Sequence, residues 1–170
     1  MVLLGEGVAT VSVDQRGDIV PRAPLTDDEF MAAFEGGTLR AWGHDCKIRV
    51  IYLLLQRRGR TGQSASAIIE TLAAAEGVDA HLTVNYFWVQ MVTYHMAVVA
   101  KSASASSSAD ANEGDGRAKC GLTFNEFMAQ PRCQALREQL LYQKYYSRGV
   151  IDRAAIEFVL PDLKQLPTLV

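Results

Sequence analysis

The spacing of apolar residues along this chain changes after residue 24. Before that point, Val11 and Val13 alternate with polar neighbours, a period of two that predicts a short β-strand. A second apolar pair begins at Ile19 after a turn-like segment, so a hairpin is expected. We therefore interpret residues 1–24 as a short β-like extension. Because a lone hairpin is marginally stable, it should dock on the rest of the chain, pair with a second copy or stay loose.

From residue 25 onward, apolar residues recur every three or four positions, which predicts amphipathic helices. The first helix begins with Thr26 and Glu29, the two residues of a capping box, and should end at Gly36. Thr123 and Glu126 repeat this start signal later in the chain. The remaining helices are expected at about 44–58, 63–76, 81–100, 123–129, 132–146 and 152–160.

These elements predict an all-α fold, a single-domain bundle of about six or seven helices over residues 25–167. Residues 101–119 are rich in Ser, Ala, Asp and Gly and contain no bulky apolar side chain, so we expect a disordered insertion there. Short loops flank the helix over 63–76. The helices before and after it should therefore run parallel and begin at the same end of the bundle.

Composition narrows the classes of function. The chain has 170 residues, of which 49% are apolar and 21% charged, so one domain with a substantial core is expected. The net charge is −2, whereas a nucleic-acid-binding protein usually carries a basic face, so nucleic acid is not expected as a partner. The longest apolar run, residues 50–55, is far shorter than the roughly 20 residues that cross a membrane. No signal-peptide pattern is present, and three widely spaced cysteines indicate a reducing compartment, which points to the cytoplasm.

The residues best suited to chemistry lie where two of the helices should begin. His44 opens one of these helices and His81 the other, so parallel helices would bring both imidazoles to one end of the bundle, beside Lys47. Histidine titrates near neutral pH, and either one could act as a general acid or base. Lys47 could stabilise developing negative charge. His95 lies far along the second helix and is expected in the core.

Five further side chains are candidate substrate contacts, although each also fits a role in the core. Thr83 and Tyr86 could orient a substrate, and Tyr52, Phe87 and Trp88 could form the walls of a pocket. None of the common motifs of metalloproteases, phosphate-binding loops, serine hydrolases or dinucleotide-binding folds occurs in the chain.

Four stretches of the chain carry a resemblance to a known family. They are residues 44–52, residues 81–88 from His81 to Trp88, and Tyr145-Tyr146-Ser147 together with Pro161-Asp162-Leu163. They resemble the pattern His-x-x-His-Leu-x-x-Ala-Trp/Tyr, His-x-Thr-x-x-x-Phe-Trp, Tyr-Tyr-Ser and Pro-Asp-Leu of a largely uncharacterised bacterial and fungal family of small helical proteins. The resemblance covers about residues 25–100 and 121–167, and it implies a place in natural-product metabolism.

One position departs from the pattern of that family. Lys47 stands where the second histidine of the first motif is expected, and a protonated lysine cannot bind a metal ion. If relatives hold a metal through the paired histidines and His81, this chain lacks one ligand. We therefore expect neither a metal nor another cofactor.

The leading hypothesis is a cofactor-independent enzyme of secondary metabolism, an isomerase, dehydratase or cyclase that uses His44, His81 and Lys47 on a small metabolite. The first alternative is a non-catalytic helical module that binds a ligand or a partner protein. The second alternative is a metal-dependent enzyme. A homodimer formed through the N-terminal extension is also considered, while neither nucleic acid nor membrane is expected as a partner.

Overall fold

The computed structural model describes residues 11–13, 19–21, 24–39, 42–106, 121–153 and 157–167, in two compact units divided after Leu39. In the first unit, strand β1 (Val11–Val13) pairs antiparallel with β2 (Ile19–Pro21), with Val13 opposite Ile19. Helix α1 (Asp27–Glu35) follows. Its start is the predicted capping box, in which the Thr26 hydroxyl accepts the Glu29 amide and the Glu29 carboxylate accepts the Thr26 amide.

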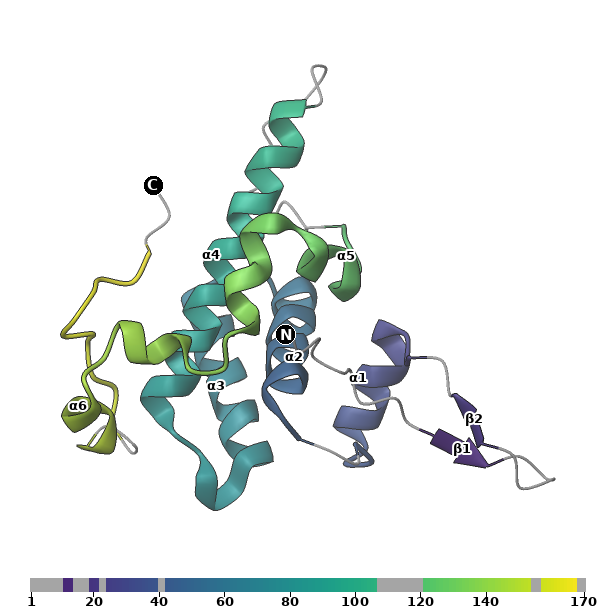
Figure 1. Ribbon diagram of the computed structural model, residues 1–170, viewed down its shortest axis with the longest axis horizontal. Helices are drawn as coiled ribbons and strands as arrows, with labels where there is room; N and C mark the ends of the chain where they lie inside the picture. The colour runs from purple at the N-terminus through teal and green to yellow at the C-terminus, as the bar shows by residue number, and fades with distance from the viewer. Residues whose placement is uncertain are drawn as a thin grey trace, which may run out of the picture. The chain divides into compact units, whose positions relative to one another are not determined.

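The second unit is built around three helices, α2 (His44–Arg58), α3 (Gly62–Glu76) and α4 (Leu82–Ser106). The short 3₁₀ helix η1 (Gly77–Asp79) links the last two. Gly59 and Gly77 end their helices with positive φ angles of 81° and 60°, a conformation that glycine adopts without steric cost. The predicted bounds of α2 and α3 are therefore confirmed to within one residue. Figure 1 shows the three helices side by side.

An ion pair and two hydrogen bonds join the ends of these helices. Lys47 in the first turn of α2 pairs with Glu76, the last residue of α3, and Glu76 accepts a hydrogen bond from Asn85 in the first turn of α4. The start of α2, the end of α3 and the start of α4 therefore meet. The prediction that α2 and α4 run parallel is confirmed.

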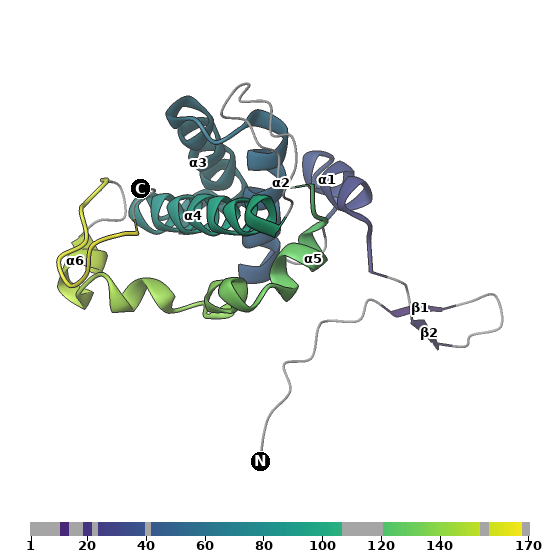
Figure 2. The ribbon, with the colours of Figure 1, turned by 90° about the horizontal axis from the view of Figure 1, so that it is seen from above.

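The core of the second unit is apolar and draws most heavily on α2 and α4. Figure 2 shows α3 on one side of α4 and the chain from α5 to α6 along the other. The largest fully buried side chains of this unit are Trp88, Tyr52, Tyr146, Phe87, Phe127, Ile48, Ile51, Leu55, Ile68, Leu72 and Leu136.

Helix α4 continues beyond its predicted end. Residues 101–106 form its last turns, where we had expected the disordered insertion to begin. The helix can continue through this stretch because its residues are Lys, Ser and Ala, none of which breaks a helix. The Ser102 hydroxyl also donates to the carbonyl of Val98 one turn earlier. The rest of the predicted insertion, residues 107–119, lies outside the described residues.

The helix predicted over 132–146 is wrong. After α5 (Phe124–Ala129), which starts with the predicted capping box at Thr123, the chain forms two 3₁₀ helices, η2 (Pro131–Arg137) and η3 (Leu141–Lys144). Within η2, the three-residue spacing of Cys133 and Leu136 brings both onto the buried side, since side chains at i and i+3 align in a 3₁₀ helix.

The last helix also differs from the prediction of 152–160. Helix α6 spans Arg148–Arg153, and residues 157–160 are not helical. Their backbone is bound instead by the side chain of Thr83, which accepts the Val159 amide and donates to the Glu157 carbonyl. These tertiary hydrogen bonds replace the ones that a helix would have made.

The described part of the chain is mostly helical, so the all-α class is correct, and its two strands lie in the N-terminal unit. Within the same described residues, no helix combines the length and the apolar composition needed to cross a membrane.

Candidate functional site

A buried polar cluster, formed by Lys47, Glu76 and Asn85, occupies the point where α2, α3 and α4 meet. The Lys47 ammonium pairs with one oxygen of Glu76 and donates to Asn85 Oδ1 at 3.1 Å. Asn85 Nδ2 donates to the other oxygen of Glu76 at 2.7 Å, which closes the triangle. The side chains of Lys47 and Glu76 are only 15% and 7% exposed, and Asn85 is fully buried. The cluster therefore holds one cation, with its charge balanced, in a fixed position at the shared helix ends.

His44, the first residue of α2, lies one helical turn before Lys47 and is partly exposed. Its Nε2 lies 2.7 Å from the backbone oxygen of Leu136 in η2. Its ring meets the indole of Trp88 edge-on, with the ring centroids 4.6 Å apart. The imidazole is therefore fixed between η2 and α4 by one hydrogen bond and one aromatic contact.

The partner of His44 determines its tautomer. A carbonyl oxygen only accepts, so Nε2 must carry the proton and the neutral ring keeps its lone pair on Nδ1. Burial is the main effect on the pKa of His44 and lowers it from the ordinary value of 6.5. The positive charge of Lys47 lowers this pKa further, whereas the hydrogen bond to Leu136 and the charge of Asp45 raise it. The ring is therefore neutral at neutral pH and can accept a proton at Nδ1.

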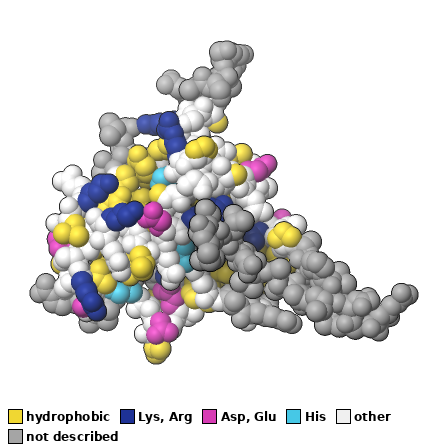
Figure 3. Space-filling model, viewed as in Figure 1, with side chains coloured by type: hydrophobic (Ala, Val, Ile, Leu, Met, Phe, Trp, Pro, Cys, Tyr) yellow, Lys and Arg dark blue, Asp and Glu magenta, His cyan; other side chains and the backbone are white. Residues whose placement is uncertain are grey.

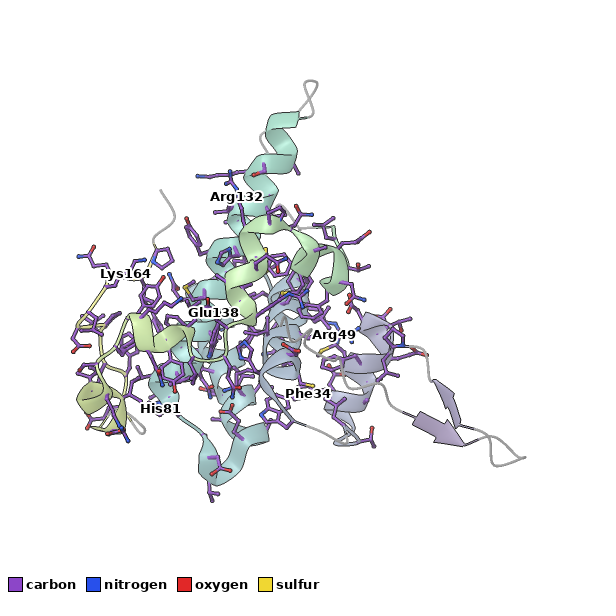
Figure 4. All side chains as sticks on the ribbon, viewed as in Figure 1. Phe34, Arg49, His81, Arg132, Glu138 and Lys164 are labelled. Atoms are coloured by element: carbon purple, nitrogen blue, oxygen red, sulfur yellow. The ribbon has the colours of Figure 1, made fainter. Side chains whose placement is uncertain are left out.

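The second predicted catalytic histidine is placed differently. His81 directly precedes α4, and its Nδ1 accepts the amide of Val84 at 3.3 Å, as the side chain of a helix cap does. Its Nε2 lies 3.0 Å from the carbonyl oxygen of Ile151 in α6 and must be the donor. Figure 4 shows His81 at the start of α4, next to α6. Both ring nitrogens are used, which favours a structural role for this histidine.

His44 and His81 thus lie at the same end of the bundle but contact different segments. His44 meets Trp88, seven residues and about 10 Å along the axis of α4 from His81. The start of α4 at His81 therefore binds α6, while His44 is contacted two turns further along the helix, at Trp88.

The predicted substrate contacts are occupied by the protein itself. Tyr52, Phe87 and Trp88 are fully or almost fully buried, and the Tyr52 hydroxyl donates to the Leu122 carbonyl at 2.6 Å. Thr83 and Tyr86 contact the C-terminal strap, which we define as residues 157–164. Thr83 binds the backbone of the strap, and the ring of Tyr86 lies 4.1 Å from that of Phe158.

Sequence reasoning missed Glu76 and Asn85. A carboxylate at the last residue of a helix is unfavourable because the negative end of the helix dipole lies there. Glu76 in this position, just before Gly77, was therefore a signal that a cation would be found nearby. Asn85 gave no comparable signal, because a buried amide is identified by its partners, which come from two other helices.

His95 lies in the core, as expected. It is 8% exposed, its Nδ1 has no hydrogen-bond partner within the described ranges, and burial lowers its pKa. In the part of the chain that the structure describes, no three residues among His, Cys, Asp and Glu are grouped as a metal site would require.

Comparisons with protein families, with curated proteins and with solved structures find no match to this chain.

Proposed function

We propose that this protein is an enzyme of small-molecule metabolism that catalyses a proton transfer, in an isomerisation, a dehydration or a cyclisation, with His44 as the general base. The observation that carries the proposal is the state of His44, a partly exposed imidazole that is kept neutral by burial, with the lone pair of Nδ1 fixed by the bond from Nε2 to Leu136. A base with a lowered pKa is deprotonated at neutral pH and ready to remove a proton.

The polar cluster supplies the second element of this mechanism. Glu76 and Asn85 hold the Lys47 ammonium in one place, next to the turn that carries His44. A cation that is already in position can stabilise negative charge as it develops on a substrate, without reorganising during the reaction. Glu76 and Asn85 are positioning residues in this scheme, because they act through Lys47.

The other predicted site residues receive supporting roles in the proposal. Trp88 orients the His44 ring and is itself packed against Phe87, whereas Tyr52 stacks on Phe127 in the core. His81 caps α4 and binds α6. The family resemblance supports a substrate from natural-product metabolism, although the chemistry of His44 would suit any metabolite with an acidic C–H group.

Solvent deuterium provides a test that does not require the substrate to be known. The purified full-length protein is incubated in D₂O with a small-molecule extract of the producing cells, and metabolite masses are compared with those of an incubation without protein. When proton removal from carbon is reversible, a solvent deuteron returns to that carbon, so the substrate, or in an isomerisation its product, should gain deuterium. His44→Gln should lower the exchange rate by about 10²–10⁴-fold.

Asp45→Asn is the matched control, because it changes an exposed neighbour and leaves the imidazole in place, and the loss of the Asp45 charge lowers the pKa of His44 further, so the base stays neutral. It should retain exchange. If no metabolite gains deuterium with the wild-type protein, or if both variants behave like the wild type, the proton-transfer proposal is wrong.

A second candidate function, a helical binding module, is favoured by the side chains on the surface. Leu140, Leu160 and Leu163 are 56%, 71% and 59% exposed. On the face shown in Figure 3, hydrophobic side chains gather between Lys and Arg side chains over the C-terminal half of the chain. Binding of a metabolite or partner protein without any protein-dependent deuterium exchange would favour this alternative.

A further inference from the structure

We infer that the C-terminal strap is a displaceable lid and that it covers a ligand surface formed by Thr83, Tyr86 and Tyr146. The ligand class that fits is a planar aromatic compound with a carbonyl group next to the ring. In the closed state, the strap supplies both features itself, a carbonyl at Glu157 and a ring at Phe158.

The contacts of Thr83 and Tyr86 define what the surface recognises. The Thr83 hydroxyl, fully buried, donates to the oxygen of Glu157 at 2.5 Å, and the ring of Tyr86 packs against the neighbouring Phe158. A carbonyl oxygen and an aromatic ring are therefore bound side by side on two residues of one helix face. A small aromatic ketone presents the same pair of groups over the same short span.

Tyr146 gives an independent indication of a missing ligand. It is 1% exposed, and its hydroxyl has no hydrogen-bond partner among the residues that the structure describes. Burial is the main reason that its pKa is raised to about 12, and the charges of Tyr86 and Asp162 raise this pKa further. The Tyr146 ring packs edge-on against Phe87, at a centroid distance of 6.2 Å, and Phe87 lies four residues after Thr83 on the same side of α4. A buried donor without a partner is uncommon in proteins, and a ligand with a polar substituent would satisfy it.

Polar and ring contacts attach the strap to the described residues around it. Besides the contacts of Thr83 and Tyr86, the carboxylate of Asp162 accepts the Ser147 amide at 2.8 Å, the amide of Leu163 donates to the Tyr145 carbonyl, and Lys164 lies over the Tyr145 ring. Most of its apolar surface faces outward, with Phe158 43%, Leu160 71% and Leu163 59% exposed. Segments with so little buried apolar surface open locally at low free-energy cost.

This surface is separate from the proposed catalytic residues. Thr83 and Tyr86 are three residues apart and share one face of α4, whereas Asn85 and Trp88 share another, about 200° further round the helix. The inference therefore does not rest on a role for His44. Binding and proton transfer can fail independently.

Acetophenone is the probe, titrated into the isotope-labelled full-length protein and followed by NMR. We expect saturable shifts of the Thr83 and Tyr86 amides. Phe158→Ala removes the ring that competes for Tyr86, so it should tighten binding roughly three- to tenfold, as expected when a larger fraction of the protein is binding-competent. Leu160→Ala, on the exposed side of the same strap, is the matched control and should bind like the wild type.

Hydrogen exchange supplies the second measurement. The amide of Val159 should exchange faster in Thr83→Val, which keeps the shape of the side chain but removes its hydrogen bonds, while amides of α2 stay protected. Shifts located elsewhere, equal affinity in the wild type and Phe158→Ala, or no saturable binding to either protein would overturn the inference. A Val159 amide as protected as the core would also overturn it, because the strap would then not be displaceable.

Discussion

The backbone oxygen of Leu136 lies 2.7 Å from Nε2 of His44, across 92 residues of sequence. An uninterrupted α-helix would offer that oxygen to the amide of Leu140. In this protein η2 ends at Arg137, and the oxygen is available to the imidazole. This one bond therefore links the end of a helix, the position of His44 and the tautomer of its ring.

Acid should destabilise the fold through two histidines. Burial lowers the pKa values of His44 and His95 in the native state, so below about pH 6.5 the unfolded chain binds more protons than the native one. The free energy of unfolding should therefore fall as the pH falls below that value, by at most about 1.4 kcal/mol per pH unit for each histidine. Urea midpoints at pH 7.5, 6.5 and 5.5 measure the effect.

His95→Leu is the informative control for this pH dependence. It removes a buried titratable group whose Nδ1 has no partner, so it should stabilise the protein more at pH 5.5 than at pH 7.5. The same loss of stability in acid with and without His95 would show that this histidine does not contribute.

The same deletion of a hydroxyl at two buried tyrosines should have different effects. Tyr52 donates to the Leu122 carbonyl at 2.6 Å and accepts from Gln56, whereas the Tyr146 hydroxyl has no partner. Tyr52→Phe should therefore cost about 1–3 kcal/mol, because it removes the shorter of two hydrogen bonds to the Leu122 carbonyl and the acceptor of Gln56, and Tyr146→Phe should cost nothing or stabilise slightly. Denaturant unfolding of both variants decides the comparison, and equal losses would contradict it.

Local sequence signals predicted the helices whose ends depend on local chemistry. Thr26 with Glu29, and Thr123 with Glu126, form capping boxes in the structure, and Gly59 and Gly77 end helices where expected. In each case the residue that starts or stops the helix lies within a few positions of the backbone groups whose hydrogen bonds or conformation it determines. Such a pairing can be read from the chain alone.

The errors arise where distant residues compete for the backbone. His44 binds an oxygen within the predicted helix 132–146, and Thr83 binds the backbone of the segment predicted as helix up to residue 160. The residues of the candidate site likewise divide into those recognisable from the sequence and those that depend on long-range contacts. His44 and Lys47 were recognised by residue type, whereas Glu76 and Asn85 form part of the cluster only because three helix ends meet.

The second capping box should be visible in the titration of one carboxylate. Thr123 donates to Glu126 from its amide and from its hydroxyl, each at 2.8 Å, and these bonds lower the pKa of Glu126. Thr123→Ala removes the hydroxyl, so the pKa of Glu126 should rise toward its ordinary value, and the loss of the cap should cost about 1 kcal/mol. Carboxyl-carbon NMR follows the titration. An unchanged Glu126 pKa would show that the hydroxyl bond is not formed in solution.

The polar cluster should behave as a coupled unit. Lys47→Met leaves the Glu76 carboxylate buried without its cation, and we expect it to lose about 3 kcal/mol of unfolding free energy, as broken buried ion pairs do. Glu76→Gln in that background removes the unpaired charge and keeps the hydrogen-bonding shape that Asn85 contacts. Lys47→Met/Glu76→Gln should therefore recover most of the loss.

The double-mutant cycle separates this network from an ordinary surface pair. Lys47 also donates to Asn85, so three groups share the free energy and the single variants should not add. A coupling of about 1 kcal/mol or less would be typical of an exposed salt bridge, and it would mean that solvent screens the pair despite its burial. A larger coupling would mean that Glu76 and Asn85 fix the Lys47 ammonium rigidly. That rigidity is the property that the proposed role of Lys47 requires, so the cycle tests the catalytic proposal without needing a substrate.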